Sequence, residues 1–310
     1  MTNTKASVAG EFIRRASIFR NWIKQDDKAE FKAEPNRYHI YVSYACPWAH
    51  RTLVVRKLKG LEDVISYSSV DWLLEDYGWA FGSNFPDPHH PNFTHLRQIY
   101  QLQQQNFNGH ITVPVLFDLK TQKIVNNESS EIIRMLNSEF NMYAKYPDVD
   151  LYPELLRENI DSINDEVYTK LNNGVYRAGF ARTQEAYENA CHDVFEVLDK
   201  LEIILSKSRY LVDNKRLTEA DVRLWTTLVR FDPVYVTHFK CNKKLITKDY
   251  PNLYGFLREI YQMNGIKETV RMDEIKKHYF ASHTSINPMR IVAAGPEIDY
   301  DIPHKRDTIN

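Results

Sequence analysis

The stretch RYHIYVSYACPWAHRTLVVRKLKG (residues 37–60) decides how the first part of the chain is interpreted. Its opening RYHIYV (37–42) alternates in a way that is typical of a strand. The following AHRTLVVRKLKG (49–60) predicts a helix that stops at Gly60. DVISYSSVD (63–71) predicts a second strand. The three elements form a strand–helix–strand unit, for which parallel pairing is the default.

The rest of the chain predicts an α/β region followed by helices. We expect a short helix near 94–104, strands at 111–118 and 121–127 that form a hairpin, and helices at 128–140, 153–171, 183–207, 218–230, 252–263 and 266–277. We divide the chain into an arm (1–37), an α/β domain (38–141), an all-helical domain (152–282) and a tail (283–310).

Length and composition exclude several classes of protein. The 310 residues are enough for two packed domains. Lys+Arg (40) balances Asp+Glu (41), which argues against nucleic-acid binding. There is no strongly apolar run of the roughly 20 residues that a membrane helix needs, and the N-terminus lacks the apolar core of a secretory signal. We therefore expect a cytoplasmic protein that binds neither membrane nor nucleic acid.

The three cysteines are too few for a disulfide framework, and we expect Cys191 and Cys241 to be structural. Cys46 lies where the strand gives way to the helix, and Pro47 suits the first helical position. Unpaired helix N–H groups and the helix dipole should lower the pKa of this thiol below its usual value of about 8.5. The alternative is a small buried hydrophobic residue; we weigh a reactive thiol over it at about 4:1.

Cys46 lacks a resolving partner, because Ala49 occupies the position where a dithiol motif carries its second cysteine. Such a thiol can form a mixed disulfide but needs an external thiol to release it. The stretch therefore indicates monothiol exchange with a small thiol such as glutathione.

The proline in TVPVLF (112–117) leaves two alternatives open. A cis Val113–Pro114 bond would turn the backbone groups of Val113 outward, towards a peptide-like ligand. A trans proline at a sheet edge is the commoner case, since only about 5–6% of X–Pro bonds are cis.

Several motifs together closely resemble the glutathionyl-hydroquinone reductases, the Xi class of glutathione S-transferases. These are CPWAHRTLVVRKLKGLE, NNESSEIIRML, NNGVYRAGFA, LTEADVRLWTTLVRFDPVYVTHFKCN, NLYGFLREIYQMNGI and HYFASHTSINP, and the resemblance covers residues 10–305. It implies an α/β thioredoxin-like N-terminal domain plus an all-α C-terminal domain. Thr218 and Asp221 form the N-capping box that the superfamily uses in its helical domain.

The resemblance also implies a reaction. Cys46 would attack the sulfur of a glutathionyl-hydroquinone, and a second glutathione would release the resulting mixed disulfide. Tyr176, Tyr235 and Tyr279 match the family's substrate-side residues. We assign Tyr176 as the leading acid, because the leaving ring needs a proton, and expect Tyr235 and Tyr279 to hold the substrate oxygen or the thiolate.

Glutathione is the only co-substrate that the resemblance implies, and no metal is expected. Its expected binding residues are Trp79, His110, Val113, Pro114, Glu128 and Ser129. Ser129 and the helix N–H groups suit the γ-glutamyl carboxylate, and Glu128 suits the ammonium group. The backbone of Val113 would pair with the cysteinyl part, and Trp79 would pack on the tripeptide. His110 stands where the family often has arginine, which would give a weaker, pH-dependent donor.

Other functions are weighed against this one. An omega-like thiol transferase or dehydroascorbate reductase would need Cys46 but not the three tyrosines, and a non-catalytic glutathione-binding protein would need neither. A reductive dehalogenase remains a possible relative. Metal sites in DPHHPNF (87–93) or HFKC (238–241) lack the ligand pairs of a closed zinc site. Proteins of this fold usually pair, so we expect a homodimer.

Overall fold

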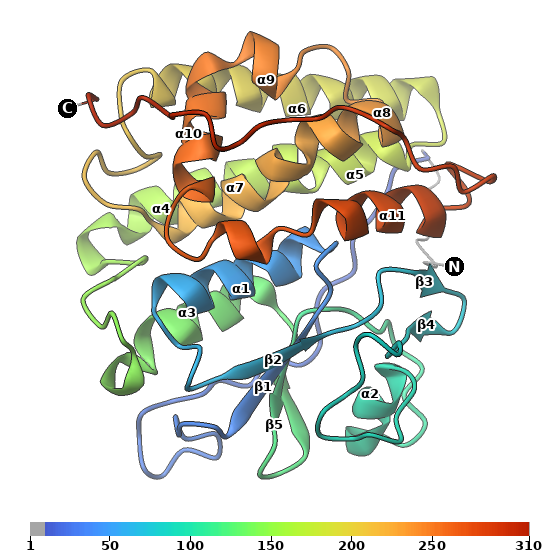
Figure 1. Cartoon of the computed structure of the whole chain (residues 1–310), viewed down its shortest axis with the longest axis vertical. Coiled ribbons are helices and arrows are strands. Elements are labelled where there is room, and N and C mark those ends of the chain that lie inside the picture. The colour runs from blue at the N-terminus through green and yellow to red at the C-terminus, as the bar shows by residue number, and fades with distance from the viewer. Residues whose placement is uncertain (1–9, 310) are drawn as a thin grey trace. The chain divides into compact units, whose positions relative to one another are not determined.

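The computed structural model describes residues 10–309 (Figure 1), and these divide into two compact units. The first unit holds residues 16–150 and 268–278. The second holds residues 10–15, 151–267 and 279–309. The first nine residues of the predicted arm and the last residue of the predicted tail lie outside the described residues.

The first unit is built on a four-stranded sheet with the order β2-β1-β5-β6. Its strands are β1 (Tyr38–Val42), β2 (Ser66–Ser69), β5 (Val115–Asp118) and β6 (Lys123–Asn126). β1 pairs with β2 in parallel and with β5 antiparallel, and β5 and β6 form an antiparallel pair. The predicted strand–helix–strand unit and the predicted hairpin are therefore confirmed.

Helices cover this sheet. α1 (Pro47–Leu58) and α3 (Ser129–Ser138) pack against each other on one side of it (Figure 1). α2 (Arg97–Gln103) lies against β6. Leu53 and Val54 of α1 and Ile132 of α3 are fully or almost fully buried. Each such side chain contributes about 1.5–3 kcal/mol through burial, which holds the helix starts in place above the sheet.

Two local features of this unit differ from the sequence-based expectation. The strand expected at 111–118 begins only at Val115, because Pro114 has no N–H to donate to a strand ladder. A short hairpin of β3 (Leu74–Glu75) and β4 (Gly78–Trp79) lies in a segment that we had predicted to be loop. Gly78 turns this hairpin with a φ of 109°, a conformation that favours glycine.

The second unit is helical. The α-helices of six or more residues that lie wholly in this unit are α4 (Arg157–Glu166), α5 (Gly174–Gly179), α6 (Gln184–Leu205), α7 (Glu219–Arg230) and α10 (Pro251–Tyr261). Its short elements are the 3-10 turn η2 (Glu154–Leu156), the π-helical turns η3 (Val167–Asn172) and η4 (Phe231–Tyr235), α8 (Val236–His238) and α9 (Ile246–Asp249). The 3-10 turn η1 (Asn141–Tyr143) belongs to the first unit. The 3-10 turn η5 (Lys267–Thr269) and α11 (Met272–Ser282) each contribute residues to both units.

The helix predictions hold best where a cap marks the start. The capping box of α7 is confirmed, with the Thr218 N–H donating to Asp221 Oδ2 at 2.8 Å. The single helix predicted at 153–171 is wrong, because α4 ends at Glu166 and a π-helical turn follows it. The last helix runs from 272 to 282 rather than from 266 to 277.

Candidate active site

Cys46 is the N-cap residue of α1, as the sequence predicts. The chain leaves β1 at Val42 and turns, with the Cys46 N–H donating to Ser43 O at 3.1 Å. Pro47 occupies the first helical position, and the Cys46 carbonyl accepts the first helical hydrogen bond from His50 N–H at 3.0 Å. The thiol is partly exposed. It therefore lies at the positive end of the helix dipole and remains accessible to a reactant.

The other two cysteines have a different environment. Cys191 and Cys241 are both fully buried. Burial raises the pKa of the Cys241 thiol, which keeps it protonated. This burial agrees with the structural role expected for both residues.

Val113 lies beside the thiol. The Cys46 thiol donates a hydrogen bond to the Val113 carbonyl oxygen at a sulfur–oxygen distance of 3.5 Å. The Val113–Pro114 peptide bond is cis, which settles the alternative that the sequence left open. The structure thus brings the predicted nucleophile next to the residue whose backbone was expected to bind the cysteinyl part of glutathione.

The start of α3 forms a second part of this region. Glu128 is the N-cap residue, and its carboxylate accepts from Ser130 N–H at 3.1 Å and from the Ser17 hydroxyl at 3.0 Å. Ser129 is the first helical residue and is buried, and its oxygen accepts from Arg51 Nη1 at 3.4 Å. Arg51 follows Cys46 by five residues on α1, so this contact joins the starts of the two helices.

Arg51 was not among the predicted site residues. It is almost fully buried, and its guanidinium lies 4.5 Å from the Trp48 ring centre. The sequence shows an arginine about one turn into α1, but it does not show the contact with Ser129, because the two residues are 78 positions apart.

Trp79 and His110 have different surroundings. Trp79 ends β4 and is buried, and its ring stacks on His278 with centroids 5.1 Å apart and an interplanar angle of 23°. His278 Nδ1 lies 2.8 Å from the Trp72 carbonyl oxygen, which fixes the imidazole against the indole. His110 is exposed in the loop that precedes Val113.

The three predicted tyrosines lie together in the second unit. Tyr176 comes from α5, Tyr235 ends the π-helical turn η4, and Tyr279 lies on α11. The Tyr279 hydroxyl oxygen is 2.6 Å from that of Tyr176 and 3.1 Å from that of Tyr235. Tyr279 is therefore the centre of a chain of three phenols. Pro233 removes a helical N–H inside η4, in agreement with the widened turn there.

Burial distinguishes the members of this chain. Tyr235 and Tyr279 are almost completely inaccessible, whereas Tyr176 is partly exposed. Burial, with a smaller contribution from Tyr176, raises the pKa of both buried tyrosines well above 10. Arg230 acts in the opposite direction on both, and the hydrogen bond with Tyr279 does so on Tyr235. Both remain protonated at neutral pH, so each can donate a hydrogen bond along the chain towards Tyr176.

No metal site is expected in the histidine-containing segments 87–93 and 238–241. Within residues 10–309, no group of three or more His, Cys, Asp or Glu side chains is placed to hold a metal ion. His90 Nδ1 instead lies 2.9 Å from Asp87, which also accepts from the Tyr41 hydroxyl at 3.0 Å. No helix in the described part of the chain is long and apolar enough to cross a membrane.

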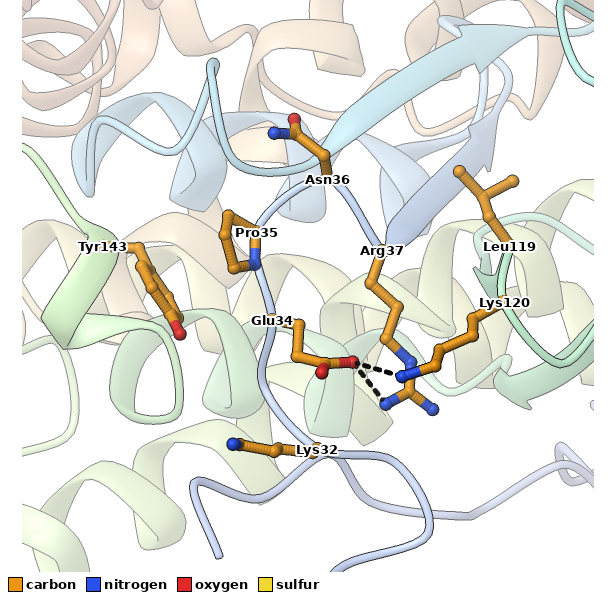
Figure 2. A pocket seen from close by; sticks show the side chains of 8 residues that line it. All are labelled: Lys32, Glu34, Pro35, Asn36, Arg37, Leu119, Lys120 and Tyr143. Atoms are coloured by element: carbon orange, nitrogen blue, oxygen red, sulfur yellow. Dashed lines mark hydrogen bonds and ion pairs between the residues drawn. The ribbon is translucent and has the colours of Figure 1, made fainter. Parts of the chain in front are cut away.

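A separate depression lies at the opposite end of β1 from Cys46. It is an open space of about 620 Å³ lined by Lys32, Glu34, Pro35, Asn36, Arg37, Leu119, Lys120 and Tyr143 (Figure 2). Glu34 Oε2 accepts from both Arg37 and Lys120, as the dashed lines in Figure 2 show. Glu34 therefore offsets part of the positive charge of Arg37 and Lys120, and we do not assign this depression to the thiol chemistry.

Comparison with known proteins identifies the class. Residues 45–139 match the family model "Glutathione S-transferase, N-terminal domain", and residues 184–259 match "Glutathione S-transferase, C-terminal domain". The chain belongs to the glutathione S-transferase family, which agrees with its α/β unit and its helical unit.

Individual relatives narrow this assignment to the Xi class. Glutathionyl-hydroquinone reductase YqjG of Escherichia coli is 54% identical, with 97% of this chain and 94% of the relative covered. "Glutathione S-transferase omega-like 2" of Schizosaccharomyces pombe is 49% identical, with 96% and 98% covered. The crystal structure of glutathione S-transferase Xi from Phanerochaete chrysosporium has a TM-score of 0.92 at 50% identity, with 98% of each chain covered. The glutathione-bound structure of YqjG has a TM-score of 0.90, with 94% and 96% covered.

Proposed function

We propose that the chain reduces glutathionyl-hydroquinones with glutathione, and that it releases hydroquinone and oxidised glutathione. The observation that carries the proposal is the single thiol at the N-cap of α1, with Pro47 after it and Ala49 in place of a resolving cysteine. Such a thiol accepts one glutathionyl group and needs external glutathione to release it. The E. coli relative bears this activity in its name, and its structure was solved with glutathione bound.

In the first step, the Cys46 thiolate attacks the glutathionyl sulfur of the substrate. A sulfur–sulfur bond forms, the carbon–sulfur bond breaks, and its electron pair passes to the hydroquinone ring. Tyr176 donates a proton to the substrate ring, either directly or by way of the keto tautomer of the hydroquinone, and Tyr176 becomes a phenolate. The sulfur is oxidised to the disulfide level and the ring is reduced, so the electrons balance.

In the second step, glutathione gives its thiol proton to the Tyr176 phenolate and attacks the mixed disulfide as a thiolate. Oxidised glutathione leaves, and the Cys46 thiolate is restored. Tyr235 and Tyr279 support Tyr176 by donating hydrogen bonds along the chain of phenols. Their direct contact with substrate oxygen or with the thiolate, which the resemblance implied, fits their burial less well.

Glutathione binds in this proposal to the first unit. The amide of its cysteinyl part pairs with the Val113 backbone, whose carbonyl becomes available once the Cys46 thiol has ionised and no longer donates to it. Its γ-glutamyl carboxylate accepts from Ser129 and from the N–H groups that open α3. Glu128 binds the ammonium group, and Trp79 packs on the tripeptide. His110 and Pro114 complete the proposed set.

A single-turnover experiment without free glutathione tests the reaction. We expect mass spectrometry to find one glutathione on Cys46 and free hydroquinone in equal amount, and Cys46→Ser to give neither. Tyr176→Phe should slow the release of hydroquinone but leave exchange with a glutathionyl disulfide nearly unchanged, because a thiolate leaves without needing a proton. An unmodified Cys46 together with rapid reduction of a glutathionyl disulfide or dehydroascorbate would favour the omega-like function instead.

We also propose that the chain works as a homodimer in the cytoplasm. The support for the dimer is that proteins of this fold usually pair, and the support for the cytoplasm is that the proposed reaction consumes reduced glutathione. Light scattering of the purified chain tests the first part: the expected mass is twice 36.5 kDa, and a single copy at micromolar concentration contradicts it.

A further inference from the structure

The N-terminal segment 10–15 belongs to the same unit as the three phenols. Gly10 is fixed there, because its carbonyl accepts from Arg182 N–H at 3.1 Å and its φ is 79°. A side chain at this position would also meet Thr183 at 3.0 Å. The segment lies outside both family matches, which begin at residues 45 and 184. The general family models therefore do not describe this segment.

This segment packs directly on Tyr176. Phe12 stacks on the Tyr176 ring with centroids 6.1 Å apart, and on Phe180 at 5.5 Å. The Arg14 guanidinium lies 4.8 Å from the centre of the Tyr176 ring. Arg14 Nε donates to Asn173 Oδ1 at 2.7 Å, and Asn173 directly precedes α5, which carries Tyr176. Arg14 is thus anchored at the start of α5, the helix that carries Tyr176.

A cation over a tyrosine ring interacts differently with the two forms of the phenol. It attracts the neutral ring weakly, through the negative face of the π-system. Once Tyr176 has given up its proton, the ring carries negative charge, and the attraction to the guanidinium increases. An interaction that is stronger after proton transfer than before it lowers the barrier to that transfer.

We propose that Arg14 is a positioning residue for carbon–sulfur cleavage, which stabilises the Tyr176 phenolate and makes segment 10–15 part of the catalytic machinery. The inference rests on the proposed function. It adds that the segment serves the thioether reaction alone, because disulfide exchange expels a thiolate and forms no phenolate. The substrate class that depends on the segment is therefore aryl thioethers of glutathione.

The test compares Arg14→Met and Arg14→Lys with Arg15→Met, which removes the same charge from the exposed neighbouring residue. Steady-state and single-turnover rates are measured with a glutathionyl-hydroquinone and with a mixed disulfide of glutathione. Arg14→Met should lower kcat for the thioether about tenfold, as expected for a cation–π contact of this kind. In Arg14→Met, KM should change less than about twofold and the rate of disulfide exchange should be unaffected. Arg14→Lys should keep most of the thioether rate of the unmodified protein.

Two results would overturn the proposal for Arg14. One is a thioether rate for Arg14→Met equal to that of Arg15→Met. The other is an equal loss of both activities with no rescue by lysine, which indicates a purely structural role. Failure of the proposed function is distinguishable from both, because the unmodified protein would then exchange disulfides but release no hydroquinone.

Discussion

Replacing Tyr279 by phenylalanine removes the hydroxyl that joins the other two phenols. Its oxygen lies 2.6 Å from that of Tyr176 and 3.1 Å from that of Tyr235. Burial raises the pKa of Tyr279 and Tyr235 well above 10, so both keep their protons when, in the proposed mechanism, Tyr176 loses its own. The two hydrogen bonds among the phenols then point the same way: Tyr235 donates to Tyr279, and Tyr279 donates to the Tyr176 phenolate.

The size of the effect follows from these contacts. A hydrogen bond to a charged group contributes about 1.5–3 kcal/mol, so kcat for hydroquinone release should fall about 10- to 150-fold. The variant also deprives the buried Tyr235 hydroxyl of this partner, which costs about 1–3 kcal/mol of unfolding free energy. Adding Tyr235→Phe removes both groups and should restore much of that stability without restoring the rate.

The assay is single-turnover release of hydroquinone, with disulfide exchange and denaturant unfolding measured on the same preparations. Tyr254→Phe is a matched control, because it removes a hydroxyl that donates to Asp299 O at 3.2 Å, outside the three-phenol chain. Release by Tyr279→Phe at the unmodified rate, or an equal slowing of disulfide exchange, would refute the reasoning.

Two further predictions concern the first unit. Ser129→Ala should raise KM for glutathione about 5- to 10-fold, because it removes one hydrogen bond to the γ-glutamyl carboxylate. Ser130→Ala is the control and should leave this KM unchanged, because its hydroxyl bonds only to Glu128. Equal KM values for the two variants would contradict the proposed site at Ser129. Desolvation by burial, with a smaller contribution from His89, lowers the pKa of His39 to about 3. Between about pH 6.5 and pH 3 the unfolded chain therefore binds a proton on His39 that the folded chain does not bind. Unfolding free energy should therefore fall on acidification by up to about 1.4 kcal/mol per pH unit in this window, and His39→Gln should reduce that slope in urea titrations; an unchanged slope would show that other groups dominate.

The parts of the fold that could be predicted are those with a local cause. Pro47 after Cys46 marks a helix start, and the Thr218/Asp221 pair caps another, since each signal is contained within one turn. The break after Glu166 could not be predicted in this way. A π-helical turn has more residues per turn than an α-helix, but over the six residues of η3 this difference is too small to appear in the pattern of apolar residues.

The same distinction separates the proposed nucleophile from the residues proposed to support it. The position of Cys46 at a helix N-terminus depends on its immediate neighbours, so the sequence alone identifies it. Arg51 reaches Ser129 and Arg14 reaches Tyr176 over separations of 78 and 162 residues, and no periodic pattern records such contacts. This division has a chemical counterpart. In the proposed mechanism, thiol exchange needs only the local site around Cys46, whereas cleavage of an aryl thioether needs a proton donor that long-range packing must assemble.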